Sequence, residues 1–257
     1  MNGIKKILRT CLALAMLAII GVTLPLSFAG SLILWCVTAP FDPNRKVLHL
    51  YSCYCMAFWL YLMPDWHIRV DGREKIRKDK VYVIICNHQS LLDILIAAQL
   101  FTHFKYVSKA EVTKIPMIGW QLALNRYILI RRGYVNSISK MMTDCEHALA
   151  QGSSILLFPE GTRSKDGQIM PFKPGAFILA EKQHAPVLPV VIYGTRDAIP
   201  IDSRISLDAQ RIWMKVLDPI PYEEYSQYSH EENLVRVRTL MAKHLKLMEK
   251  RLELGLS

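Results

Sequence analysis

Two short segments contain the side chains whose types and spacing are best suited to chemistry. Residues 87–93 (NHQSLLD) contain His88 and Asp93, and residues 158–164 (FPEGTRS) contain Arg163. A histidine whose ring is held by a carboxylate can act as a general base toward a hydroxyl group. An arginine in a tight turn suits a phosphate monoester, because a guanidinium donates parallel hydrogen bonds to two oxygens. The sequence therefore predicts proton transfer beside a phosphate-binding loop.

The geometry of the first segment depends on where a helix begins. Residues five apart in a helix point some 140° from each other, so His88 and Asp93 would not meet if both were helical. They meet if His88 lies on the turn that leaves a strand and Asp93 lies in the first turn of the next helix. Ser90 as the N-cap would place Asp93 at the third helical position, where a negative charge is favoured. The competing interpretation is an Asp93 that only caps the helix and a His88 satisfied by a backbone carbonyl.

The second segment must turn sharply after a strand. Pro159 removes a hydrogen-bond donor and Gly161 permits a tight turn. The freed backbone amides, with the Thr162 hydroxyl and Arg163, are expected to form a phosphate cradle. The competing interpretation is a turn held by a Glu160–Arg163 ion pair, and Glu160 is expected to be structural in either case.

The pattern of apolar residues after residue 64 predicts the fold that holds these two segments. Short β-branched runs alternate with amphipathic stretches, which is typical of a single α/β domain with a mixed, largely buried sheet flanked by helices. We expect strands at residues 81–86, 104–108, 127–131, 154–158, 187–193 and 212–217. We expect helices at residues 90–100, 118–124, 137–150 (capped by Asn136 or Ser137), 174–184 and 231–254.

The apolar excess lies at the N-terminus, and we divide the chain into a membrane-associated helical segment (1–64) and the α/β domain (65–257). Residues 10–41 carry no charge, and about 32 helical residues would reach roughly 48 Å against a hydrocarbon core of about 30 Å. Such a helix either tilts or breaks near Gly21 and Pro25. Residues 47–64 form a second uncharged stretch rich in aromatic side chains, which favours an interfacial or barely spanning helix.

Charge predicts the orientation of the domain. Two membrane spans, or two helices that enter the membrane and return, would leave the domain on the same side as Lys5, Lys6 and Arg9. An excess of lysine and arginine is typical of the cytoplasmic side, so we expect the domain to be cytoplasmic. The alternative is a cleaved signal peptide, with residues 27–29 (SFA) as the cleavage site.

Composition limits the partners and cofactors. The formal charge of +10 favours anionic partners such as lipid headgroups, and no recognition motif for nucleic acid accompanies it. The six cysteines contain no C-x-x-C pair, which favours a reduced, cytoplasmic setting. The histidines lack the spacing of metal ligands, so we expect no metal.

In the two segments 87–93 and 158–164 the chain resembles the glycerolipid acyltransferase superfamily, and within it the bacterial 1-acylglycerol-3-phosphate acyltransferases. The N-H-x4-D block implies that His88 is the base and Asp93 its orienting carboxylate. The F-P-E-G-T-R block implies an acceptor site formed by Glu160, Gly161, Thr162 and Arg163. Two lesser blocks also match, residues 172–177 (FKPGAF) and 187–192 (VLPVVI). An intermediate block departs from the family pattern: Arg132 matches an arginine thought to assist phosphate binding, whereas Arg131 replaces a variable aspartate.

The resemblance implies transfer of a fatty acyl group from acyl-CoA or acyl-ACP to the 2-hydroxyl of lysophosphatidic acid, giving phosphatidic acid, at a bacterial inner membrane. No other cofactor is implied, and Cys86 is expected to be a buried strand residue rather than an acyl acceptor. Lys109 is a weaker candidate for substrate binding. The alternatives are another acceptor, such as glycerol 3-phosphate or a lyso-aminolipid, and a non-catalytic membrane protein that binds lipid.

Overall fold

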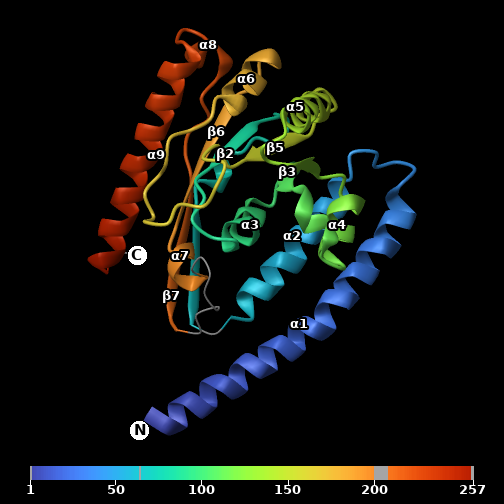
Figure 1. Cartoon of the computed structure of the whole chain (residues 1–257), viewed down its shortest axis with the longest axis vertical. Helices are drawn as coiled ribbons and strands as arrows, with labels where there is room; N and C mark the ends of the chain where they lie inside the picture. The colour runs from blue at the N-terminus through green and yellow to red at the C-terminus, as the bar shows by residue number, and fades with distance from the viewer. Residues whose placement is uncertain (1, 64, 200–207, 256–257) are drawn as a thin grey trace.

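The computed structural model describes residues 2–63, 65–199 and 208–255, and a seven-stranded mixed sheet lies at its centre (Figure 1). The strand order is β1-β7-β6-β2-β5-β3-β4. All neighbouring pairs are parallel except β6 and β7, which confirms the predicted mixed sheet. The strands are β1 Trp66–Asp71, β2 Val83–Cys86, β3 Phe104–Lys109, β4 Ile128–Ile130, β5 Ser154–Leu157, β6 Val187–Tyr193 and β7 Gln210–Val216.

Helices cover both faces of the sheet, so alternate residues of the central strands enter two separate cores. Val83 and Ile85 of β2 pack toward α5 (Val135–Ala150), α6 (Gly175–Lys182) and α9 (His230–Glu253). Ile84, between them, packs toward α3 (Leu92–Ala97) and the 3-10 turn η2 (Ala98–Leu100). Figure 1 shows α9 and α3 on opposite sides of the sheet. Burial on both faces explains why β2 is apolar throughout its length.

Most predicted elements are present, with shifts at their ends. β6 and α4 (Ile118–Leu124) have the predicted bounds. The predicted cap of α5 is wrong: its N-cap is Tyr134 without a side-chain bond, because the Ser137 hydroxyl accepts a hydrogen bond from the amide of Arg131 instead. The elements without a sequence prediction are β1, η1 (Arg73–Lys75), η3 (Ala110–Lys114), α7 (Thr195–Ala198) and α8 (Tyr222–Tyr225).

The first apolar stretch forms a single helix, α1 (Asn2–Thr38), which continues through Pro25 rather than breaking there. Its segment Leu14–Thr38 is the one stretch among the described residues that is long and apolar enough to cross a bilayer. The N-terminal half of α1 projects away from the domain, whereas its C-terminal half lies along α2 and α4 (Figure 1). Close packing requires Gly30, where a Cβ atom would collide with the Tyr51 hydroxyl.

The second apolar stretch is α2 (Lys46–Tyr61), and it packs on the domain. At 16 residues it extends about 24 Å, less than a hydrocarbon core. The buried ring of His49 lies against the sheet, with Nδ1 2.8 Å from the Tyr127 hydroxyl and Nε2 3.0 Å from the carbonyl oxygen of Thr102. Of the two alternatives for this stretch, the barely spanning helix is wrong, because one face of α2 is part of the protein interior, whereas the interfacial helix stays a prediction.

Candidate active site

The two motif segments leave the same edge of the sheet. Parallel strands β2, β5, β3 and β4 all end at this edge, and ligands of open α/β sheets bind outside such carboxyl ends. Residues 87–93 follow β2, and residues 158–164 follow β5. Lys109 ends β3 and pairs with Ile130 of β4, directly before Arg131 and Arg132. The topology therefore gathers the candidate residues of four separate segments at one edge.

His88 and Asp93 meet as predicted. His88 Nδ1 lies 2.8 Å from Asp93 Oδ2, with His88 on the turn after β2 and Asp93 in the first turn of α3. Because α3 begins at Leu92, Asp93 is its second residue rather than the predicted third. The predicted N-cap is also displaced, to Leu91, although the Ser90 hydroxyl still accepts from the Leu92 amide at 3.2 Å.

Asp93 is completely buried and its carboxylate is fully hydrogen-bonded. Besides the histidine, Oδ2 accepts from the backbone amides of Gln89 and Ser90 at 2.6 and 2.8 Å. Oδ1 accepts from the hydroxyl of Thr195 at 2.5 Å. These donors favour the charged carboxylate, which fixes the proton of His88 on Nδ1 and leaves Nε2 as the acceptor. The sequence analysis missed Thr195, whose only signal is its place directly after a buried strand and a glycine.

The His88 ring is also held in place by its neighbours. It stacks on Phe158, with ring centroids 4.1 Å apart and an interplanar angle of 22°. The backbone carbonyl of His88 accepts from the Ser164 amide at 2.8 Å, which ties the two motif loops together. Within the described residues Nε2 makes no hydrogen bond, so it is available for a substrate hydroxyl. The competing interpretation, a ring satisfied by a backbone carbonyl, is therefore wrong.

Glu160 is structural, and the suggested ion pair with Arg163 is absent from the described residues. One carboxylate oxygen accepts from the His88 amide at 2.7 Å, and the other accepts from the Met170 amide at 2.8 Å. Burial raises the pKa of Glu160 to about 7, although both hydrogen bonds act in the opposite direction. Glu160 thus positions His88 through the backbone, and its place in the acceptor site, which the resemblance implies, stays a prediction.

This raised pKa predicts a pH-dependent stability. Below about pH 4.5 the carboxyl is protonated in both folded and unfolded chains, whereas between pH 4.5 and 7 only the folded chain retains the proton. The wild type should therefore lose up to about 3 kcal/mol of unfolding free energy relative to Glu160→Gln as pH rises through this window. Urea unfolding of both proteins in detergent between pH 4.5 and 8 measures the difference. Parallel pH dependences would contradict the prediction.

The loop after β5 presents a cationic surface. Gly161 has a positive backbone angle φ of 72°, which favours glycine. A Cβ atom at this position would also collide with the side chain of Lys173, which lies over the turn. The pKa of the Arg132 guanidinium is lowered by lost hydration and by nearby Arg163, while Glu111 acts in the opposite direction. Thr162, on the same loop, and Lys109, at the end of β3, are both exposed to solvent. Among the described residues, neither side chain makes a contact that would give it a structural role. Two arginines held near each other form a site suited to an anion.

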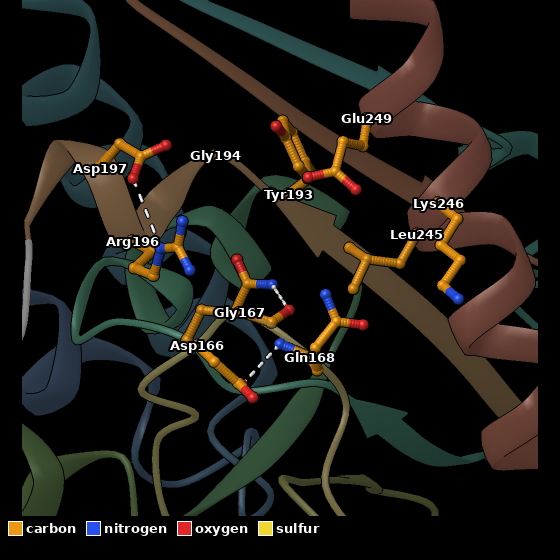
Figure 2. A pocket seen from close by; sticks show the side chains of 11 residues that line it. Asp166, Gly167, Gln168, Tyr193, Gly194, Arg196, Asp197, Leu245, Lys246 and Glu249 are labelled. Atoms are coloured by element: carbon orange, nitrogen blue, oxygen red, sulfur yellow. Dashed lines mark hydrogen bonds and ion pairs between the residues drawn. The ribbon is translucent and has the colours of Figure 1, made fainter.

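A small cavity lies beside Gln89 of the loop after β2, between α9 and the turn after β6 (Figure 2). Gln168, Arg196 and Glu249 point toward it, and the Gln89 amide donates to the Gly167 carbonyl beside it. Its volume of about 40 Å³ holds water molecules but not a lipid headgroup. A larger groove of about 450 Å³, lined by Lys75, Tyr82 and Tyr222 among others, lies at the amino end of β2. Neither cavity is the proposed acceptor site.

Comparisons with known proteins agree with this geometry. A family model described as Acyltransferase matches residues 67–193. The chloroplastic 1-acyl-sn-glycerol-3-phosphate acyltransferase LPAT1 of Arabidopsis thaliana is 34% identical over 70% of this chain and 51% of its own length. A 1-acyl-sn-glycerol-3-phosphate acyltransferase of Saccharomyces cerevisiae is 31% identical over 75% of this chain and 64% of its own length. The chain therefore spans about half to two thirds of the length of these relatives.

A solved structure shows the same fold. The crystal structure of the 1-acyl-sn-glycerophosphate acyltransferase PlsC from Thermotoga maritima superposes with a TM-score of 0.66 at 24% identity, covering 90% of this chain and 97% of that one. The mixed sheet carries a buried histidine–carboxylate pair and a cationic loop at one edge, on a fold shared with the PlsC structure. The family model and the curated relatives identify residues 67–193 as an acyltransferase domain.

Proposed function

We propose that this protein transfers a fatty acyl group from an acyl thioester to the 2-hydroxyl of lysophosphatidic acid, giving phosphatidic acid and a free thiol. The observation that carries the proposal is the buried Asp93 carboxylate 2.8 Å from His88 Nδ1, with Nε2 directed to no described protein acceptor or donor. The matched relatives are named for acylation of 1-acyl-sn-glycerol 3-phosphate, which supports the choice of acceptor.

The mechanism needs a base but no protein nucleophile. Nε2 of His88 accepts the proton of the acceptor hydroxyl while its oxygen attacks the thioester carbonyl carbon, and Asp93 stabilises the imidazolium that forms. The carbon–sulfur bond then breaks, and the thiolate takes the proton from the imidazolium. Cys86 is unsuited to form an acyl-enzyme, because complete burial raises the pKa of its thiol well above the usual value. This chemistry requires no cofactor beyond the acyl-CoA or acyl-ACP co-substrate.

We assign the acceptor phosphate to Arg163 and Arg132. Arg163→Ala should raise the KM for lysophosphatidic acid about 10- to 100-fold, because a charge-assisted hydrogen bond contributes about 1.5–3 kcal/mol. The KM for a monoacylglycerol without phosphate should stay unchanged. Arg77→Ala is the matched control, since the exposed Arg77 guanidinium pairs with Asp79 near the amino end of β2, at the opposite edge of the sheet. Equal losses on both acceptors would contradict the assignment, and no loss on either would favour an acceptor without phosphate.

The decisive assay uses the purified full chain with lysophosphatidic acid, glycerol 3-phosphate and a lyso-aminolipid as acceptors, and acyl-CoA or acyl-ACP as donors. Turnover with lysophosphatidic acid above the other acceptors supports the proposal. Turnover with any acceptor eliminates the non-catalytic alternative. Lysolipid binding without turnover would overturn the proposal.

We further propose that α1 anchors the protein by entering the cytoplasmic leaflet of a bacterial inner membrane, because a single full span would place the catalytic edge on the side opposite Lys5, Lys6 and Arg9. Unpaired cysteines and a soluble thioester donor suit a catalytic edge on the cytoplasmic side. Retention of the N-terminal segment rather than signal-peptide cleavage is supported by its packing: the Trp59 indole donates to the Thr23 hydroxyl at 3.0 Å, and Phe28 contacts Trp120. A mature N-terminus at Gly30 would overturn this part.

A further inference from the structure

We propose that η3, α4 and the first turns of α5 form a second membrane-contact surface, in addition to α1 and adjoining it, that places the catalytic edge against the lipid headgroups. Six large apolar side chains are exposed on these neighbouring segments. They are Ile115, Ile118, Trp120, Tyr134, Val135 and Ile138, and we call them the α4 surface. Such side chains usually enter a core, so their common exposure beside the candidate site calls for an apolar partner.

The α4 surface is rigidly supported. η3 packs on α4 at Gly119, where a Cβ atom would collide with the carbonyl of Thr113. Because β3 and β4 are parallel neighbours, η3, which follows β3, and the segment from β4 into α5 leave the same edge of the sheet. The exposed side chains therefore result from folded packing and not from an extended loop.

A lipid bilayer is the occupant that the surroundings favour. The α4 surface is continuous with the candidate membrane helix, because the Phe28 ring of α1 lies 5.5 Å from that of Trp120. Exposed Lys109, Lys114 and Arg131 lie along the same segments. Tryptophan and tyrosine beside basic residues match the level of lipid headgroups, where anionic lipids attract lysine and arginine.

This surface explains how a lipid acceptor reaches a base on a sheet edge. Contact of the α4 surface with the bilayer would hold Arg132 and Arg163 at headgroup depth, where the phosphate of a lysolipid already lies. The acceptor would then enter from the membrane without crossing water. The route of the acceptor rests on the proposed function, whereas the membrane contact itself does not.

Depth-dependent quenching tests the contact without requiring turnover. The full chain is reconstituted in vesicles of phosphatidylcholine and phosphatidylglycerol, with or without bromine on the acyl chains near the headgroup. The emission difference between the wild type and Trp120→Phe reports Trp120, and this difference should fall at least about twofold in brominated vesicles. The corresponding difference for Trp213→Phe, which reports a buried indole of the sheet, should not change. An unquenched Trp120 would overturn the proposal.

Kinetics test the consequence. Combined Ile115→Ser, Ile118→Ser and Trp120→Ser changes should raise the KM for a vesicle-embedded lysolipid about tenfold, because interfacial binding scales with buried apolar area. Turnover of a water-soluble short-chain acceptor should stay within about twofold. The control replaces Val235, Leu240 and Leu247 of α9 by serine, since their exposures of 66%, 37% and 47% resemble the 47%, 39% and 53% of the α4 residues. Equal losses on both acceptors, or none on vesicles, would contradict the proposal.

Discussion

His88→Ala is expected to lower kcat for acyl transfer to lysophosphatidic acid by about 10² to 10⁴-fold, the usual contribution of a general base. The KM should change little, because the acceptor phosphate is assigned to arginines on other loops. Steady-state kinetics in mixed micelles, together with a lysolipid-binding measurement, separate the two parameters. Loss of the ring also removes the stack on Phe158, which costs about 1 kcal/mol of stability.

The matched control is His147→Ala, which removes an exposed histidine of α5. It should leave kcat and stability unchanged. If His88→Ala retained most of the wild-type kcat while folded, the ring would be a structural group and the proposed mechanism would be wrong.

Asp93→Asn is expected to produce a comparable loss, about 10² to 10⁴-fold in kcat, by a different route. The amide oxygen can still accept from His88, Gln89 and Ser90, so the geometry of the loop is largely retained. However, an amide has no charge to stabilise the imidazolium formed on proton transfer. The amide nitrogen would face Thr195, whose hydroxyl must rotate to become the acceptor.

Because Asp93 is completely buried, stability must be measured beside activity. An imperfectly satisfied site costs about 1–3 kcal/mol, and thermal unfolding of the variant would show it. Asp144→Asn changes a surface carboxylate that pairs with Lys140 on α5, and it serves as the control for both measurements. A normal kcat for a folded Asp93→Asn protein would show that the carboxylate does not assist catalysis.

The local elements of the fold were predictable because their signals are short-range. The β-branched run of β6 and the turn residues Pro159 and Gly161 determine structure within a few residues, and the structure has both. The cap of α5 was not predictable, because the Ser137 hydroxyl forms a hydrogen bond outside the helix. β1 was missed although its apolar residues Trp66, Ile68 and Val70 alternate with polar ones, and its pairing partner β7 lies far along the chain.

The fate of the apolar N-terminal segment shows the same limit. Hydropathy identifies residues 47–64 as apolar but does not distinguish lipid from protein interior as the surroundings. The contacts of His49 with Tyr127 and Thr102, which lie 78 and 53 residues away, decide that one face of α2 belongs to the core. Hydropathy left open whether the first stretch tilts as one helix or breaks near Pro25, and the structure has the continuous α1.

For the site, the sequence by itself determined the chemical groups: an imidazole and a carboxylate five residues apart, and a guanidinium on a tight turn. Residue type determines which groups can accept a proton or carry a charge, so these assignments needed no coordinates, whereas burial shifts the pKa, as it does for Glu160. Tertiary structure alone decided that Thr195 completes the shell of Asp93, and that Glu160 bonds two backbone amides instead of Arg163. The contacts of Thr195 with Asp93 and of Glu160 with His88 join residues 102 and 72 positions apart, which meet only because parallel strands end at a shared edge of the sheet.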